Sequence, residues 1–279
     1  MPAPAITTVE AELAYAAAQK VVETHRRVAK FIRVGMTLAQ IDAEVAKVLA
    51  LLGCRSCFLH YRLRGLPAFP SHACLSLNEC IVHGTAGFVT RPLVEGDLLK
   101  LDIGVEYRGM IGDAAWTYSV GTPKPEVERL MESGKVALAE GVKELKPGNT
   151  YLNWARRVQE IVEMPPGKGG FGFHCVRGLG GHGYGLKKLH KPPYVSNTVP
   201  NYIGEWPEAT EKCRPGTLLA VEPMIALGTG ETRTPRKNDW PVNTADGSLS
   251  VHYEHDVLIT EEGPRVLSAG MEELPDVVG

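Results

Sequence analysis

The stretch Asp102-Ile-Gly-Val-Glu-Tyr-Arg-Gly-Met-Ile-Gly-Asp113 decides the fold, because it reads as a tight hairpin between two strands. The segments on both sides are short, rich in β-forming residues and bounded by glycine. Gly109 can supply the positive φ that a reversal requires. If the turn is centred between Tyr107 and Arg108, Asp102 and Asp113 face each other with Cβ atoms about 5 Å apart. Two like charges so placed destabilise a sheet unless a cation lies between them, so the hairpin predicts a metal site.

Composition is that of an ordinary globular protein, with 279 residues of which 44% are hydrophobic and 22% charged. A net charge of −2 gives no indication of nucleic-acid or membrane-surface binding. No apolar run approaches the roughly 20 residues that span a bilayer, and Met1 to Ala5 lack the features of a signal peptide. The six cysteines are scattered, and the lone pair Cys54 and Cys57 has no second pair to complete a zinc site. Reduced thiols and a cytoplasmic location are therefore expected.

Four amphipathic helices are expected, in two pairs. Thr7 with Glu10, and Thr37 with Gln40, have the spacing of capping boxes that begin the first pair. The expected helices cover residues 8–32, 38–52, 125–142 and 151–164. Between the pairs, residues 73–84 read as two short strands around a turn.

Two pairs of similar segments predict an internal duplication. Gly35-Met-Thr37 and Gly148-Asn-Thr150 each lead into an amphipathic helix. Later, a glycine turn leads through an apolar strand to Asp102, and another does the same to Glu222. Because both matches occur in the same order at a similar offset, we expect a duplicated α/β fold with acids from both halves at the seam.

Acids stand where strands should be apolar, and one histidine joins them. The set is Asp102, Asp113, Glu222, Glu254 and His182, the last in the glycine-dense segment 178–185, which reads as a loop. Each alone has an ordinary explanation, such as a solvated strand end or a histidine bonded to backbone. Together they would be too costly to bury uncompensated, and four carboxylates balance two divalent cations. Oxygen ligands with one imidazole suit Mn, Fe, Co or Zn, and two such ions about 3.5–4 Å apart activate a shared water, which favours a hydrolase.

With these residues, the chain resembles the type I methionine aminopeptidases of the pita-bread superfamily. The resemblance extends over about residues 8 to 268, in family order. It is carried by Ser76-Leu-Asn-Glu-Cys-Ile-Val-His83-Gly84, Asp102 to Asp113, Gly181-His182-Gly183, Val221-Glu222-Pro223-Met224 and Ser248-Leu-Ser-Val-His-Tyr-Glu254-His255. It implies an α+β pita-bread fold with antiparallel sheets covered by helices and a dinuclear metal site at the centre. One catalytic domain, residues 1–279, would consist of pseudo-two-fold halves at about 8–122 and 123–268.

The resemblance also implies roles for the metal-binding residues. Two divalent metal ions (Co, Mn, Fe or Zn) would be ligated by Asp102, Asp113, His182, Glu222 and Glu254. Asp113 and Glu254 would bridge both ions, and Glu222 would also accept the proton of the attacking water. The backbone around Asn78, Cys80 and Ser250 would hold a monovalent cation.

Further residues are implied for the substrate. His83 would contact the scissile amide or the transition state, and His190 would hydrogen-bond the substrate carbonyl. The pocket for the methionine side chain would include Phe69, Cys74, Leu189 and Trp240. Leu66 and Leu189 depart from the aromatic residues of other family members.

The expected function is removal of the initiator methionine from nascent polypeptides, with a small residue preferred in second place. The chain would act as a cytoplasmic monomer with transient ribosome association, without a nucleic-acid motif and without a membrane partner. One alternative is a pita-bread peptidase for Xaa-Pro bonds, although such enzymes usually carry an extra N-terminal domain. The other is a non-enzymatic family member with an incomplete site, although all the ligand positions and His83 are filled here.

Overall fold

The computed structural model describes residues 6–279, and Met1 to Ala5, which lack signal-peptide features, lie outside them. Its helices are α1 (Thr8–Phe31), α2 (Leu38–Leu51), α3 (Pro125–Val142) and α4 (Tyr151–Glu163), with 3₁₀ turns η1 (Pro166–Lys168), η2 (Pro207–Thr210) and η3 (Met271–Glu273). Its strands are β1 (Arg55–Ser56), β2 (Cys74–Leu77), β3 (Cys80–Val82), β4 (Leu98–Tyr107), β5 (Met110–Val120), β6 (His174–Cys175), β7 (Gly180–Gly185), β8 (Lys188–Ser196), β9 (Leu218–Val221), β10 (Met224–Ala226), β11 (Thr232–Arg233), β12 (Val242–Thr244), β13 (Ser250–His252), β14 (His255–Thr260), β15 (Gly263–Val266) and β16 (Val277–Val278). Among the described residues, no helix combines the length and apolar character needed to cross a membrane.

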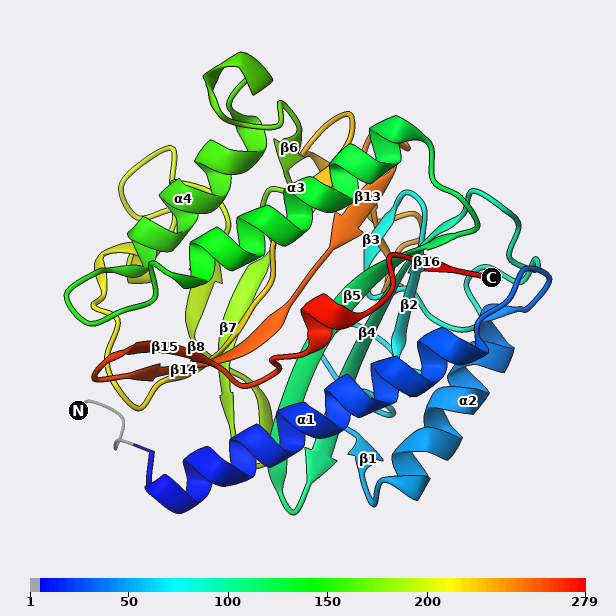
Figure 1. Cartoon of the computed structure of the whole chain (residues 1–279), viewed down its shortest axis with the longest axis horizontal. Helices are drawn as coiled ribbons and strands as arrows, with labels where there is room; N and C mark the ends of the chain where they lie inside the picture. The colour runs from blue at the N-terminus through cyan, green and yellow to red at the C-terminus, as the bar shows by residue number, and fades with distance from the viewer. Residues whose placement is uncertain (1–5) are drawn as a thin grey trace.

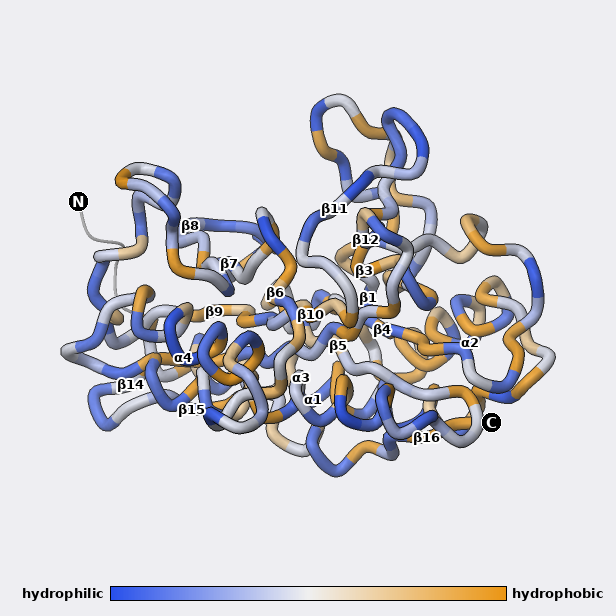
Figure 2. Tube along the Cα trace, turned by 90° about the horizontal axis from the view of Figure 1, so that it is seen from above, coloured by the Kyte–Doolittle hydropathy of each residue, from blue (hydrophilic) through white to orange (hydrophobic). Residues whose placement is uncertain are grey.

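Two larger sheets form the framework, and helices cover them (Figure 1). One has the strand order β1-β4-β5-β16, with β2 also paired to β4, and the other has the order β15-β14-β9-β7-β8. Pairing within both sheets is antiparallel except between β16 and β5. Figure 2 shows α1 to α4 along one side of the molecule, with β7, β8, β11 and β12 on the opposite side.

The predicted capping boxes are present and fix where the first helix pair begins. The Thr7 hydroxyl accepts from the Glu10 backbone N–H at 3.2 Å, and the Glu10 carboxylate accepts from the Thr7 N–H at 2.9 Å. Thr37 and Gln40 make the same reciprocal bonds at the start of α2. All four expected helices are confirmed to within one residue at their ends.

The hairpin is confirmed, but its expected register is wrong. The turn consists of Arg108 and Gly109, both with positive φ (51° and 85°), and therefore has the two-residue form that suits strand twist. This moves the centre one residue along the chain, so Asp102 pairs with Ala115 and Asp113 with Gly104. Residues two apart on a strand share a face, so the two aspartates are diagonal neighbours on one face rather than directly opposite.

The glycine-dense segment around His182 is a strand, β7, and not the expected loop. It lies between β8 and β9, and its glycines permit close backbone approach. A Cβ on Gly181 would lie 2.2 Å from the Ala220 carbonyl oxygen, and one on Gly183 would lie 2.4 Å from that of Pro192. Close backbone approach therefore explains Gly181 and Gly183, whereas Gly178, just before the strand, has a positive φ of 75°.

The two large sheets meet where β5 passes the start of β14. The Glu254 N–H donates to the Ala115 carbonyl at 2.9 Å, and the Asp113 N–H donates to Asp256 Oδ2 at 2.8 Å. On the other face of β5, a Cβ on Gly112 would lie 2.6 Å from the Ala17 backbone, so α1 packs tightly there. Because neighbouring side chains on a strand point to opposite faces, Asp113 points away from α1 and toward the seam.

Two three-stranded sheets complete the framework, β13-β10-β6 and β11-β12-β3. The sequence also predicts long surface loops at residues 197–212 and 228–247, which are rich in Pro, Gly and polar residues. The second of these sheets includes parts of residues 228–247, and η2 lies within residues 197–212. Both predicted loops therefore contain short ordered elements. The β3 strand ends immediately before His83, whose φ of 58° turns the chain at that point.

Candidate metal centre and active site

The acids predicted from the sequence come from different strands and converge at the seam. Asp102 lies on β4 and Asp113 on β5, whereas Glu222 directly follows β9 and Glu254 lies between β13 and β14. All four side chains are buried or nearly so, and Glu254 is only 2% exposed. The ordinary explanation that Glu254 faces water is therefore wrong.

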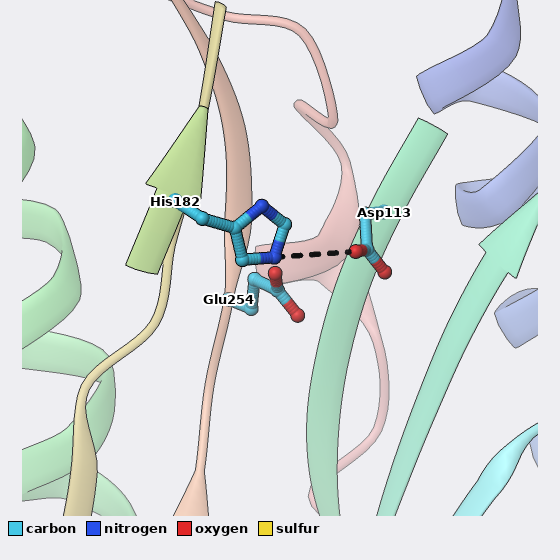
Figure 3. Close-up of side chains that lie close together, drawn as sticks. All are labelled: Asp113, His182 and Glu254. Atoms are coloured by element: carbon cyan, nitrogen blue, oxygen red, sulfur yellow. Dashed lines mark ion pairs between the residues drawn. The ribbon is translucent and has the colours of Figure 1, made fainter. Parts of the chain in front are cut away.

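Asp113, His182 and Glu254 lie closest together (Figure 3). Each offers a ligand atom, and the three atoms lie within 4.8 Å of one another. His182 Nε2 is 3.9 Å from Asp113 Oδ2 and 3.9 Å from Glu222 Oε1. Such separations leave space for an ion between the side chains, whereas direct hydrogen bonds would not.

The His182 ring is oriented by its own strand. Its Nδ1 lies 3.1 Å from the Gly183 carbonyl oxygen, which can only accept a hydrogen bond. Nδ1 therefore carries the proton, and the lone pair of Nε2 points toward the acids. This is the arrangement in which histidine usually ligates a metal.

Burial keeps the metal-free acids from ionising freely. Burial raises the pKa of Asp102 to about 7 and that of Glu222 to about 8. The pKa of Asp113 and that of Glu254 are raised well above the usual range by burial and then by neighbouring carboxylates. Burial also lowers the pKa of His182 to about 3, so its imidazole is neutral. A divalent cation bound between these acids would favour their ionised forms, and the neutral imidazole could ligate it as well. The buried group is therefore suited to a divalent cation.

Orphaned polar atoms test whether a metal fits. Asp102 Oδ1 and Asp113 Oδ1 are buried and have no hydrogen-bond partner among the described residues. Buried polar atoms without partners are costly. Since both atoms belong to acids at the seam, the residues present fit divalent metal ions.

A pocket of about 230 Å³ opens beside these acids. Every catalytic, metal-binding and substrate-binding residue expected from the sequence lines it. These are Phe69, Cys74, His83, Asp102, Asp113, His182, Leu189, His190, Glu222, Trp240 and Glu254. Leu66, in contrast, does not line this pocket and packs against the neighbouring apolar cluster.

Aromatic rings form the apolar side of the pocket. The Trp240 ring packs edge-on against Phe69 (5.3 Å between centroids) and against His83 (6.1 Å). Its indole N–H donates to the Pro67 carbonyl at 3.0 Å, which fixes the ring in place. A half-buried His83, whose pKa burial lowers to about 4, is a neutral imidazole between this wall and the acids.

Sequence reasoning missed several residues of the site. Phe58, Tyr61 and Leu63 line the pocket, and the Tyr61 hydroxyl lies 2.7 Å from His190 Nδ1. His252 is buried with its Nε2 atom 3.2 Å from Glu222 Oε2. One signal could have found it, because His252 precedes Glu254 by two residues and so shares its side of an extended chain.

The expected place of a monovalent cation already contains a side chain. Lys100 Nζ donates to the Asn78 carbonyl oxygen at 2.6 Å, and the Ser250 N–H and hydroxyl donate to the same oxygen. The residues around Asn78 therefore do not fit a bound monovalent ion.

Comparison with known proteins assigns the chain to a family. The sequence profile described as metallopeptidase family M24 matches residues 12–261. A methionine aminopeptidase of Aquifex aeolicus is 33% identical over 257 residues, which are 90% of this chain and 93% of that protein.

Solved structures agree in fold. The crystal structure of a methionine aminopeptidase from Thermotoga maritima superposes with a TM-score of 0.82 at 30% identity, covering 95% of this chain and 98% of that one. A Xaa-Pro dipeptidase from Bacillus anthracis has a TM-score of 0.70 at 19% identity, and only 62% of that chain is covered. The expected pita-bread fold is thus confirmed, and the chain belongs to metallopeptidase family M24, among the methionine aminopeptidases.

Proposed function

We propose that the chain is a methionine aminopeptidase that removes the initiator methionine from nascent polypeptides. One observation carries this proposal: the acids, histidines and apolar residues expected for that reaction line a single pocket. The near-complete coverage of methionine aminopeptidases supports the same substrate class. The Xaa-Pro dipeptidase is similar in fold at only 19% identity and gives no support to that alternative, and a full set of acids does not favour an inactive family member.

Five side chains would hold two divalent ions, of Co, Mn, Fe or Zn. These are Asp102, Asp113, His182, Glu222 and Glu254, with Asp113 and Glu254 shared between the ions. Four carboxylates match the charge of two divalent cations, and the orphaned oxygens of Asp102 and Asp113 support this loading. When bound, the ions supply an acidified water and electrostatic stabilisation of a tetrahedral transition state.

Three residues would handle the substrate and its protons. Glu222 lies deep in the pocket and would accept the proton of the attacking water. His83 would hydrogen-bond the scissile amide, and its neutral imidazole makes it able to donate or accept. The Tyr61 hydroxyl at Nδ1 orients His190, whose other nitrogen would hydrogen-bond the substrate carbonyl.

The apolar wall would hold the methionine side chain. Phe69 and Trp240 offer aromatic surface, and Cys74 and Leu189 are soft or flexible neighbours. Thioether sulfur makes favourable contacts with such rings. We include in the proposal a preference for a small second residue.

Exposed basic side chains around the pocket support a transient encounter with the ribosome. They flank pocket-lining residues on three segments: Arg62, Arg64, Lys188, Lys191, Arg236 and Lys237. A local basic rim on a chain of net charge −2 attracts polyanions such as ribosomal RNA without a dedicated nucleic-acid motif. We further propose a cytoplasmic monomer whose single catalytic domain, 1–279, is built from halves at about 8–122 and 123–268.

Peptide hydrolysis tests the proposal. The protein is assayed on Met-Gly-Met and on an Ala-Pro peptide, with EDTA and then with added Mn²⁺ or Co²⁺. The expected result is metal-dependent release of methionine from the first peptide alone. Cleavage of Ala-Pro alone would overturn the proposal in favour of a Xaa-Pro peptidase, and no cleavage with any metal would overturn both enzymatic functions.

A further inference from the structure

Lys100 is a buried lysine held by a peptide carbonyl instead of an acid. Its side chain lies inside the sheet on β4 and the residue is 1% exposed. Lysine is almost never fully buried without a partner. Among residues 6–279 its single hydrogen bond is from Nζ to the Asn78 carbonyl oxygen at 2.6 Å, and it forms no ion pair with any described acid. Main-chain carbonyl oxygens commonly bind alkali ions, whereas a buried lysine usually pairs with an acid.

The Asn78 carbonyl oxygen, which binds Lys100, accepts hydrogen bonds from two other segments of the chain. Asn78 forms the turn between β2 and β3 with a left-handed φ of 55°. Besides Lys100 Nζ from β4, its carbonyl oxygen accepts the Ser250 N–H at 3.2 Å and the Ser250 hydroxyl at 3.1 Å, both from β13. The Asn78 side chain donates to Asp97 at 2.9 Å and accepts the Leu98 N–H at 2.9 Å. The turn is therefore fixed from several sides, and Lys100 supplies its basic contact.

The Asn78 carbonyl oxygen is poorly suited to bind a separate monovalent ion while Lys100 is bound to it. A carbonyl oxygen has two lone pairs, and this one already receives three donors. An alkali ion on the same oxygen would also lie within a few ångströms of the lysine nitrogen, where two positive charges repel strongly in a buried environment.

We propose that the Lys100 side-chain nitrogen takes the place of a monovalent cation, so that this chain requires no K⁺ or Na⁺. The bond ties the turn that leads through β3 to His83 to the strand that carries Asp102, two residues after Lys100. One internal contact thus holds two parts of the pocket in register. The inference concerns the active site of the proposed function, but its principal test measures stability and not methionine release.

Charge around Lys100 agrees with this assignment. Burial lowers the pKa of Lys100 to about 7, and Cys80, Glu79 and Asp97 act in the opposite direction by favouring the ammonium form. The nitrogen fills the same position in either protonation state. The assignment therefore rests on where the atom lies.

Thermal unfolding in different salts tests the proposal. The wild-type protein and Lys100→Ala are each melted in KCl, NaCl and choline chloride at one ionic strength, choline being too large to enter the turn. The wild-type Tm is expected to be the same in all three salts. Lys100→Ala removes one of the three donors to this oxygen and opens space, so its Tm should be about 2–3 °C higher in KCl or NaCl than in choline, as for a ligand at ten times its Kd.

A matched control and a direct binding measurement complete the experiment. Lys168→Ala removes an exposed lysine in η1 and should melt identically in all three salts. A wild-type Tm that rises in KCl or NaCl would overturn the proposal, and so would a folded Lys100→Ala with equal Tm in every salt. If Lys100→Ala does not fold, ²⁰⁵Tl NMR of the wild-type protein decides: no bound thallium supports the proposal, and a bound signal contradicts it.

Discussion

His252 Nε2 lies 3.2 Å from Glu222 Oε2 and 3.9 Å from Glu254 Oε2. One buried imidazole therefore faces two of the proposed metal ligands, and its own pKa is lowered to about 4 by burial. His252 Nε2 makes no hydrogen bond with the described residues, but at this distance a small rotation of the ring would let a protonated Nε2 donate to Glu222 and restrict the rotation of that carboxylate. Groups that orient metal ligands in this way matter nearly as much as the ligands.

The first prediction follows from this contact. His252→Ala should lower kcat or metal affinity by about 10–100-fold, because the Glu222 carboxylate loses the imidazole that lies against it and can orient it. His252→Gln keeps a donor of similar reach and should recover most of that loss. Steady-state kinetics combined with Mn²⁺ titration monitor both effects. Equal losses for alanine and glutamine would contradict the proposed role of His252 as a donor to Glu222.

A second prediction concerns Asp113, whose carboxyl is buried beside other acids. In EDTA, Asp113→Asn should stabilise the protein by about 1–3 kcal/mol, because the buried Asp113 carboxyl must take up a proton on folding, whereas asparagine is neutral in both states and has the same shape. With Mn²⁺ the same variant should show little gain in Tm and lose activity, because a proposed shared ligand is missing. Urea unfolding in EDTA and thermal melts with metal measure these two effects. Glu231→Gln, at an exposed acid, is the control and should change neither; an active, metal-loaded Asp113→Asn would contradict the ligand assignment.

The third prediction is that metal stabilises the protein more as pH rises. Asp102 and Glu222 have folded pKa values raised to about 7 and about 8, whereas carboxyls in the unfolded chain titrate near about 4. The metal-free folded state therefore holds protons that the unfolded chain has released, and the stability from these groups is lost progressively as pH rises from about 4 to about 8. A bound metal requires the deprotonated acids, so the difference in Tm between Mn²⁺ and EDTA should grow over this window.

Comparing the two conditions at each pH removes contributions common to both, such as those of His25 and Lys100, whose pKa values are lowered by burial to about 4 and about 7. A metal-induced gain that shrinks as pH rises would show that the acids are already ionised in the metal-free fold. Metal binding would then no longer explain why Asp102 Oδ1 and Asp113 Oδ1 lack hydrogen-bond partners.

The hairpin illustrates how far the sequence could predict this site. That Asp102 and Asp113 lie on the two strands of one hairpin and share a face follows from a period of two and a glycine turn, although both lie inside their strands and not at strand ends. The register did not follow, because the choice between two turn centres depends on whether Arg108 adopts a left-handed φ, which strand twist decides.

Contacts between distant segments were the part that could not be predicted from residue patterns. The pairing of His252 with Glu222, and of Tyr61 with His190, depends on how separate sheets meet. The glycines around His182 are expected in a loop, whereas the structure places those of residues 180–185 on a strand. A run of glycine has no apolar alternation, so the pattern that normally indicates a strand is missing there.

The last prediction tests that close approach. A Cβ on Gly181 would lie 2.2 Å from the Ala220 carbonyl oxygen, and neither backbone segment can move without disturbing the pairing of β7 with β9. Gly181→Ala should therefore cost about 3 kcal/mol or more in the free energy of unfolding. It should also weaken Mn²⁺ binding, because the adjacent His182 would shift away from Asp113. Gly185→Ala, on the same strand, is the matched control, since its Cβ would meet only the flexible Lys191 Nζ at 3.2 Å. Urea unfolding and Mn²⁺ titration of both variants should separate them clearly, and equal stability would show that β7 can move away from β9 at little cost.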